Sequence, residues 1–410
     1  MQLVRNISRY IIGLMFIFSG FVKAIDPLGS TYKFTDYFTA FHLDWLGPSA
    51  LFFAVLLAAV EFVLGFALLS NALTRITSTI MFLFMSFFTL LTLYLAIANP
   101  VSDCGCFGDA IKLTNWGTFY KNLILMVPAG IVFWQRNTFQ PRFNRPVQIF
   151  IVGVGLLLSL YASKNAYQHL PPIDFRAYKI GTNIHLAMNE DWIGAPQPAF
   201  ETAVVYEKNG KQKSFASDNL PDSTWKWVET ESKLINQGYE APVQNFNITN
   251  ENKQDVTDYI LGFDGFTLMM VAYDMERIPK KTYASIKEIR DISEANGHNF
   301  FFLTASNPED VKTFSRQYGL TGDYYFADPI TLKTIIRSTP GLVLLNKGTV
   351  LNKWHYNDFP GEGQLSEYDL YQSSLQKRND QTMMLTFGFI GLWVLLIAFL
   401  EIIGLKSATR

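Results

Sequence analysis

The chain has 410 residues, of which 49% are hydrophobic and 17% charged, and a formal net charge of -1. This balance is typical of a membrane protein of two or three domains, and the lack of a basic excess excludes nucleic acid as an expected partner. Only two cysteines are present, which excludes a framework of several disulfides.

Six apolar runs are candidate membrane helices. They lie near Tyr10–Ile25, Ala50–Ser70, Ile76–Ala98, Phe119–Trp134, Val147–Ala162 and Met383–Ile403. About 20 mostly apolar residues cross the hydrocarbon core, and the second, third and sixth runs reach that length. The other three need flanking residues, and Lys23 and Lys121 are expected to snorkel to the interface. The first run lacks a small-residue cleavage site, which favours a membrane helix over a signal peptide.

Lysine and arginine residues predict the orientation of these helices. One set of loops and ends carries cations without Asp or Glu, namely Arg5, Arg9, Arg75, Arg136, Arg142, Arg145, Lys406 and Arg410. We expect this set on the cytoplasmic side of a bacterial inner membrane, with both termini. The stretch Ser163–Asp380 and the loop with both cysteines are then periplasmic, on the side that permits disulfides.

The most informative membrane motif is residues 103–109, which read DCGCFGD. Gly105 gives the backbone the freedom to bring Cys104 and Cys106 together. A disulfide closed over one residue is expected to be strained and easily reduced, which suits an exchangeable pair. Two alternatives stay open, a tight turn with two reduced thiols and a zinc site completed by His42. The redox interpretation is favoured over both, so no metal is assigned.

The charges around this pair oppose thiol reactivity. Asp103 and Asp109 flank the cysteines, and their carboxylates are expected to raise the thiol pKa. Lys112 or Lys121 offsets them if its ammonium lies close by.

Glu61 lies in the middle of the second apolar run. An ionisable group at bilayer depth usually faces the bundle interior and is a functional candidate. We expect it to pair with Asn122 or with the hydroxyls of Thr89 and Thr92. The alternative is a hydrogen bond that only packs helices beside Gly65.

Several of these features together resemble the DoxX family and its MauE branch. They are the first run with its exit at Lys23 to Pro27, Glu61, the CGCFG stretch and Lys121-Asn122. The resemblance covers residues 1–135 and implies a four-helix membrane bundle. The MauE branch is associated with maturing disulfide-bearing exported proteins and is similar to quinone-linked enzymes such as vitamin K epoxide reductase. Those enzymes usually space their cysteines by two residues, whereas this chain spaces its single pair by one.

The region between the fifth and sixth runs is expected to be water-soluble. Residues 163–235 read as a β-rich lead-in, with short alternating runs such as Ala203–Glu207. Buried strands are predicted at Gly265–Tyr273 and Asn299–Thr304, helices at Lys280–Asn296 and Pro308–Tyr318, and a hairpin at Gly341–Leu345 and Thr349–Trp354. Strands that alternate with helices predict a βαβ unit and a mainly parallel sheet.

This order resembles the thioredoxin-like fold in its peroxiredoxin and membrane-anchored thiol-reductase branch. Residues 238–243 (GYEAPV) match the opening segment, and residues 338–341 (STPG) match the loop with the cis-proline. The redox cysteines of that family follow the first buried strand, where this chain has Asp274 to Pro279 and no cysteine. The resemblance therefore implies the fold and a binding or spacer role.

The predicted architecture is an α-helical membrane bundle with an α/β thioredoxin-like soluble domain. Its parts are a four-helix domain over 1–135, a fifth helix in 136–165, a soluble domain over 166–380 with its thioredoxin-like part at 236–358, and a last helix in 381–410. The favoured function is redox maintenance of exported proteins by Cys104 and Cys106. Glu61, Lys121, Asn122, Lys23, Asp103 and Asp109 would support the pair.

Two other functions stay open, a non-enzymatic envelope scaffold and a subunit of a quinone-linked sulfur-compound oxidoreductase. A membrane quinone is the candidate cofactor. The expected partners are membrane lipid and an exported client or envelope protein.

Overall fold

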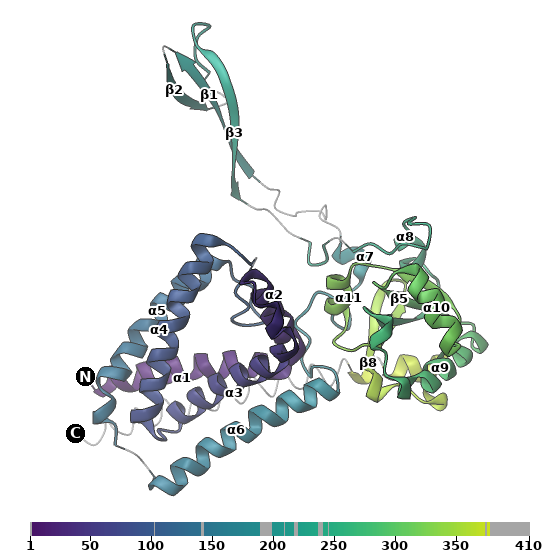
Figure 1. The fold of residues 1–410 in the computed structure, drawn as a ribbon, viewed down its shortest axis with the longest axis horizontal. Coiled ribbons are helices and arrows are strands. Elements are labelled where there is room, and N and C mark those ends of the chain that lie inside the picture. The colour runs from purple at the N-terminus through teal and green to yellow at the C-terminus, as the bar shows by residue number, and fades with distance from the viewer. Residues whose placement is uncertain are drawn as a thin grey trace.

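The computed structural model describes residues 2–377 except 102, 141–142, 189–198, 209, 217–219, 237–240, 245 and 374. Figure 1 shows a helical bundle, a domain built around a sheet at one end of the bundle, and a separate small sheet that projects away from both.

Among the residues that the structure describes, five helices are long and apolar enough to cross a membrane. They are α1 (Gln2–Ile25), α3 (Ala50–Leu69), α4 (Thr74–Ala98), α5 (Asn115–Trp134) and α6 (Arg145–Gln168). Five of the six predicted spans are thus confirmed as helices, and the sixth, Met383–Ile403, lies outside the described residues. The three runs that looked short are extended by polar flanks, so that α1 begins at Gln2 and not near Tyr10.

Glycines bring α1 and α3 into backbone contact. A Cβ built on Gly20 would lie 2.4 Å from the backbone nitrogen of Phe62, and one on Gly65 would lie 2.6 Å from the carbonyl oxygen of Gly13. Only residues without a side chain permit this approach. The crossing places Lys23 of α1 beside Glu61 of α3.

A helix that the sequence reading did not predict follows α1. It is α2 (Pro27–Ala40), which is followed by a short 3₁₀ segment, η1 (Asp44–Ser49). Asp26 caps α2 by accepting a hydrogen bond from the backbone N–H of Gly29 at 2.9 Å, and Pro27 occupies the first turn. The rings of Phe34 and Phe38 pack on Phe53 of α3, so α2 covers the start of α3.

The soluble domain is built on a five-stranded sheet of order β6-β5-β4-β7-β8. The strands are β4 (Phe266–Ala272), β5 (Asn299–Thr304), β6 (Asp323–Phe326), β7 (Gly341–Asn346) and β8 (Thr349–His355). The helices are α7 (Ile184–Ala187), α8 (Thr257–Leu261), α9 (Tyr283–Ala295), α10 (Pro308–Tyr318) and α11 (Pro329–Ile335).

This layout is thioredoxin-like, and the Thr339-Pro340 bond is cis as predicted. The predicted strands, helices and hairpin are confirmed within a few residues, whereas β6 and the short helices α7, α8 and α11 were not predicted. The prediction of a mainly parallel sheet is wrong. β4, β5 and β6 pair in parallel, but β4–β7 and β7–β8 pair antiparallel, because a two-residue hairpin turn reverses the chain between β7 and β8.

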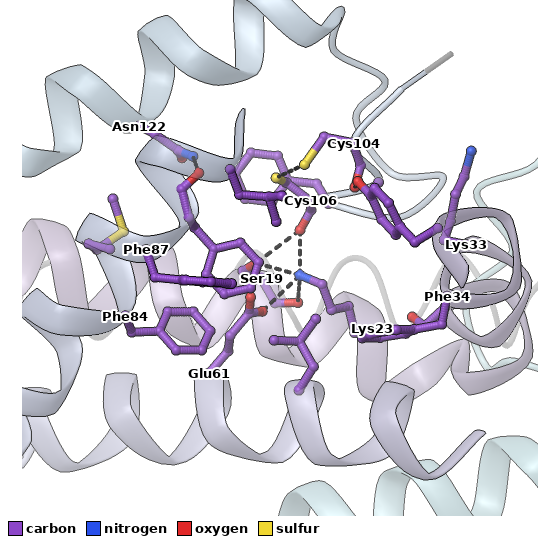
Figure 2. Close-up of a pocket in the computed structure, with 18 of the residues that line it drawn as sticks. Ser19, Lys23, Lys33, Phe34, Glu61, Phe84, Phe87, Cys104, Cys106 and Asn122 are labelled. Carbon is purple, nitrogen blue, oxygen red and sulfur yellow. Dashed lines mark hydrogen bonds and ion pairs between the residues drawn. The ribbon is translucent and has the colours of Figure 1, made fainter. Parts of the chain in front are cut away.

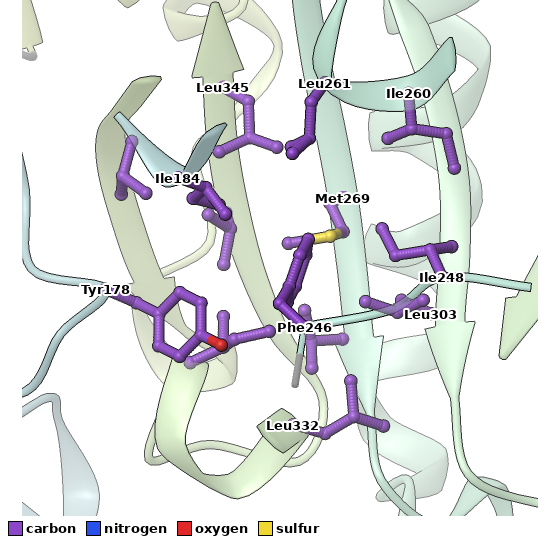
Figure 3. Packing of buried hydrophobic residues seen from close by; sticks show 14 of the residues in the cluster. Tyr178, Ile184, Phe246, Ile248, Ile260, Leu261, Met269, Leu303, Leu332 and Leu345 are labelled. Carbon is purple, nitrogen blue, oxygen red and sulfur yellow. The ribbon is translucent and has the colours of Figure 1, made fainter. Parts of the chain in front are cut away.

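The core of this domain lies on both faces of the sheet. Alternate residues of the central strands enter opposite clusters, so that Met269 and Leu303 pack on one face (Figure 3) while Met270 and Phe302 pack on the other. Period-two alternation within fully buried strands explains why these segments read as continuous apolar runs.

The β-rich lead-in is confirmed as a three-stranded antiparallel sheet. It comprises β1 (Ala199–Lys208), β2 (Lys211–Ala216) and β3 (Lys226–Asn236) in the order β2-β1-β3. In Figure 1 it stands apart from the bundle and from the larger sheet.

Candidate functional site

The two cysteines lie in the loop between α4 and α5. Gly105 and Gly108 adopt left-handed conformations with φ of 63° and 53°, and the N–H of Gly108 donates to the carbonyl of Gly105 at 3.0 Å. This turn brings the sulfurs of Cys104 and Cys106 to 2.9 Å as free thiols. Two thiols at this separation need little movement to form an S–S bond of about 2.0 Å.

Side chains from α1 and α2 hold the backbone of this loop. The hydroxyl of Ser19 and the ammonium of Lys23 donate to the carbonyl of Cys106, at 3.0 and 2.5 Å. The phenol of Tyr37 donates to the carbonyl of Cys104 at 2.8 Å. The loop is therefore fixed from below and from one side (Figure 2).

Lys23 and Glu61 form a buried ion pair beneath the thiols. Their charged groups are 2.8 Å apart, and the residues are only 5% and 7% exposed. Two predictions are therefore wrong, that Lys23 snorkels to the interface and that Glu61 pairs with Asn122 or a threonine. Pairing inside the bundle compensates the burial of both charges, and the α1–α3 crossing makes it possible.

The other predicted partners of Glu61 bond elsewhere. Asn122 is buried and its amide donates to the hydroxyl of Thr92 at 3.2 Å. The hydroxyls of Thr89 and Thr92 donate to carbonyls of their own helix. The ammonium of Lys121 lies 4.3 Å from the ring centroid of Phe107, next to the cysteine loop. His42, the candidate zinc ligand, is exposed at the end of α2.

Both aspartates of the motif are paired with cations. Asp103 lies 2.9 Å from Lys33 of α2, and Asp109 lies 2.8 Å from Arg337 of the soluble domain. Their charges are thus compensated by residues that the sequence reading did not consider. At Cys106 the expected offset is confirmed, because Lys121 is among the cations that lower the pKa of this thiol.

The surroundings favour a thiolate on Cys106. A hydrogen bond from Cys104 lowers the pKa of Cys106 to about 6, with further lowering by Lys121 and Lys23 that opposes the effect of burial. The same contact and burial raise the pKa of Cys104. The pair therefore has one reactive sulfur and one that keeps its proton.

A cavity of about 330 Å³ opens below the thiols, inside the bundle (Figure 2). Its wall is mostly apolar and includes Phe34 and Phe38 from α2, Phe41 directly after α2, and Phe84, Phe87 and Phe88 from α4. Its polar side is formed by Lys23, Glu61, Cys104, Cys106, Lys121 and Asn122. Six residues that were proposed as site residues from sequence thus line one space.

The sequence reading missed the contribution of α2. Phe34, Tyr37, Phe38 and Phe41 follow the spacing i, i+3, i+4, i+7, which is the pattern of one helix face. This pattern predicts a helix between the first and second apolar runs, where the sequence analysis assigned none. Ser19 and Arg337 carried no comparable signal.

A second, more polar cavity of about 310 Å³ lies at the end of α6. Asp174 bridges Arg176 at 2.7 Å and Lys353 at 3.0 Å there. Burial lowers the pKa of Lys353 to about 8 against the attraction of Asp174. These charges satisfy one another, so the thiol-lined cavity is the stronger site.

Comparison with known families gives a match for the first part of the chain. Residues 1–135 match the family described as methylamine utilisation protein MauE. This part of the chain is a MauE-like membrane domain. Together with the close thiol pair, the match supports a redox-related role for this multi-pass membrane protein.

Further comparisons concern the rest of the chain. Residues 200–237, which contain most of the β1–β3 sheet, match a domain of unknown function, DUF8463. A solved thioredoxin domain of a thiol-disulfide oxidoreductase from Bacteroides vulgatus is similar at 12% identity and a TM-score of 0.23, covering 32% of this chain and 91% of that one. No curated protein matches the chain.

Proposed function

We propose that the protein is a thiol-disulfide oxidoreductase of the bacterial inner membrane that maintains the redox state of exported proteins. In this proposal both termini are cytoplasmic, and the soluble domain and the cysteine loop are periplasmic. One observation carries it, namely that two thiols 2.9 Å apart line a cavity of about 330 Å³ within a membrane bundle.

Cys106 is the proposed reactive sulfur because the hydrogen bond from Cys104 and the nearby cations lower its pKa, which favours the thiolate. In the oxidising direction, a client thiolate attacks the Cys104–Cys106 disulfide and forms a mixed disulfide. The second client thiol then displaces the protein sulfur. The client gains one disulfide, and the pair takes up two electrons and two protons as a dithiol.

A membrane quinone is the proposed acceptor that reoxidises the pair. Aromatic side chains of α2 and α4 offer apolar surfaces for the ring and tail of such a molecule, and Lys121 and Asn122 offer donors at the polar side of the cavity. When the Cys104–Cys106 disulfide forms, two electrons and two protons leave with the hydroquinone.

A thiol-trapping titration tests the cysteine chemistry. The purified protein is equilibrated with dithiol buffers of increasing oxidant content, and its free thiols are counted by a mass-adding maleimide. We expect one reversible two-thiol transition, lost in Cys106→Ser and Cys104→Ser. Thiols that stay reduced in every buffer would contradict the proposal and favour an envelope scaffold.

The acceptor is tested with a short-chain quinone added to the reduced protein without oxygen. We expect one hydroquinone for each thiol pair lost. Leu91→Trp fills the cavity and should slow this step by about tenfold or more, equivalent to about 1.4 kcal/mol. Leu90→Trp is the matched control, because Leu90 is 69% exposed on the outer surface of the same helix. Equal rates in the two variants would rule out quinone binding in this cavity.

A further inference from the structure

Arg337 joins the soluble domain to the membrane domain. It follows α11 and is 5% exposed. Its Nε lies 3.1 Å from both carboxylate oxygens of Asp26, and its Nη2 lies 2.8 Å from Asp109. Its Nη1 donates to the carbonyl of Lys333. All three guanidinium nitrogens are therefore engaged, in the geometry that favours arginine over lysine.

The two carboxylates lie on the two segments that hold the cysteine pair. Asp26 directly follows α1, three residues after Lys23, and Asp109 lies three residues after Cys106. Asp26 also caps α2. One side chain of the soluble domain thus connects the helix beneath the thiols with the loop that carries them.

The docked face corresponds to the active face of thioredoxin-like reductases. Arg337 directly precedes the loop with the cis bond at Pro340. The ammonium of Lys333 lies 5.0 Å from the ring centroid of Tyr273 and 5.1 Å from that of Tyr32 in α2. Tyr273 follows β4, the place where such reductases carry their cysteines. This face presents cations to the membrane domain at the position where thioredoxin-like reductases carry thiols.

We propose that the soluble domain is a positioning module for the cysteine pair, and that Arg337 is its positioning residue. Arg337 neutralises Asp109 and holds it, so the loop keeps its place and Cys106 is not exposed to an uncompensated carboxylate. The inference rests on the thiol chemistry proposed above, but its test measures only the reactivity of the Cys106 thiol.

Several charged or titratable groups surround Cys106. Those on the neighbouring elements are Lys23 of α1, Lys33 and Tyr37 of α2, Glu61 of α3 and Lys121 of α5, and those on its own loop are Asp103, Cys104, Asp109 and Lys112. Asp109 is the one whose partner comes from the soluble domain. A change at Arg337 therefore alters the net charge beside Cys106 through Asp109.

The test measures how fast iodoacetamide alkylates Cys106 as a function of pH in the reduced full-length protein. Arg337→Gln leaves the Asp109 carboxylate unpaired, so the pH at which the alkylation rate is half-maximal (the midpoint) should rise by about 0.5–1 unit. Asp109→Asn removes the carboxylate and leaves the cation, so the midpoint should fall by up to about 0.5 unit. Lys347→Gln is the control, because Lys347 pairs with Asp264 at an exposed turn and should change nothing.

Shifts of opposite sign would support positioning by charge, because general disruption of the loop moves both midpoints the same way. An unchanged midpoint in Arg337→Gln, or a rise in Asp109→Asn, would overturn the inference. If Arg337→Gln does not fold, the direction of the midpoint shift in Asp109→Asn decides between the two outcomes. The measurement needs neither quinone nor client, so opposite shifts without a redox transition would refute the proposed function and leave the positioning role.

Discussion

At the scale of single residues, the Lys23–Glu61 ion pair has the largest consequences. Both charges are removed from water, and the ammonium also donates to Ser19 and to the carbonyl of Cys106. One lysine therefore links the buried carboxylate of α3 to the loop with the thiols. Removing either partner leaves an unpaired charge inside the bundle, which is more costly than removing both.

This asymmetry gives a prediction for stability. Lys23→Met should destabilise the protein by about 3–5 kcal/mol, because it leaves the Glu61 carboxylate buried without its partner. The double variant Lys23→Met/Glu61→Leu removes both charges and should recover most of that loss. Thermal unfolding in detergent measures both. A double variant less stable than Lys23→Met would show that burial of an unpaired charge is not the cause.

At the scale of elements, the α1–α3 crossing sets the position of this pair. Gly20 precedes Lys23 by three residues, and its Cα faces the backbone of Ala58 and Phe62. Because the contact is with backbone atoms, no change of side-chain rotamer can relieve an added methyl group.

We therefore expect Gly20→Ala to lower stability by about 1–3 kcal/mol and to weaken the contact between Lys23 and the cysteine loop. Gly153→Ala on α6 is the matched control. A Cβ at Gly153 meets nothing within 4 Å, and alanine is the better helix former, so its effect should stay within about 0.5 kcal/mol. Thermal unfolding and the thiol titration are measured for both variants. Equal losses of stability in the two would contradict the close crossing of α1 and α3.

The elements also show how far sequence reasoning reaches. Long apolar runs and buried strands such as Asn299–Thr304 were located correctly, because their pattern is local. The CGC turn was predictable for the same reason. The helix α2 was missed although its aromatic residues follow a helical spacing, whereas α11, with seven residues, is too short to show such a pattern. The pairs Lys23–Glu61 and Arg337–Asp109 join residues 38 and 228 positions apart, which no local pattern reports.

At the scale of the whole molecule, the surface of the bundle fits a lipid environment. Large apolar side chains point outward on three helices, including Leu83, Leu90, Ile97, Ile124, Val127, Phe150 and Leu157. Trp116 and Trp134 mark the two ends of α5, where aromatic residues commonly meet the membrane interface. The soluble domain and the cysteine loop meet through Arg337 and Asp109, so both belong to one side of the membrane.

The last prediction assigns that side. The cationic loops and ends around Arg75 and Arg136 lack acidic residues, so they are expected in the cytoplasm and the soluble domain outside. In a variant with both native cysteines replaced by serine, Lys211→Cys on the exposed strand β2 should react with an impermeant maleimide in intact cells. Asn137→Cys, at an exposed and uncharged site beside Arg136, should react only after lysis. The reverse pattern would invert the topology and place the thiol pair on the reducing side, where the proposed oxidation of exported proteins has no client.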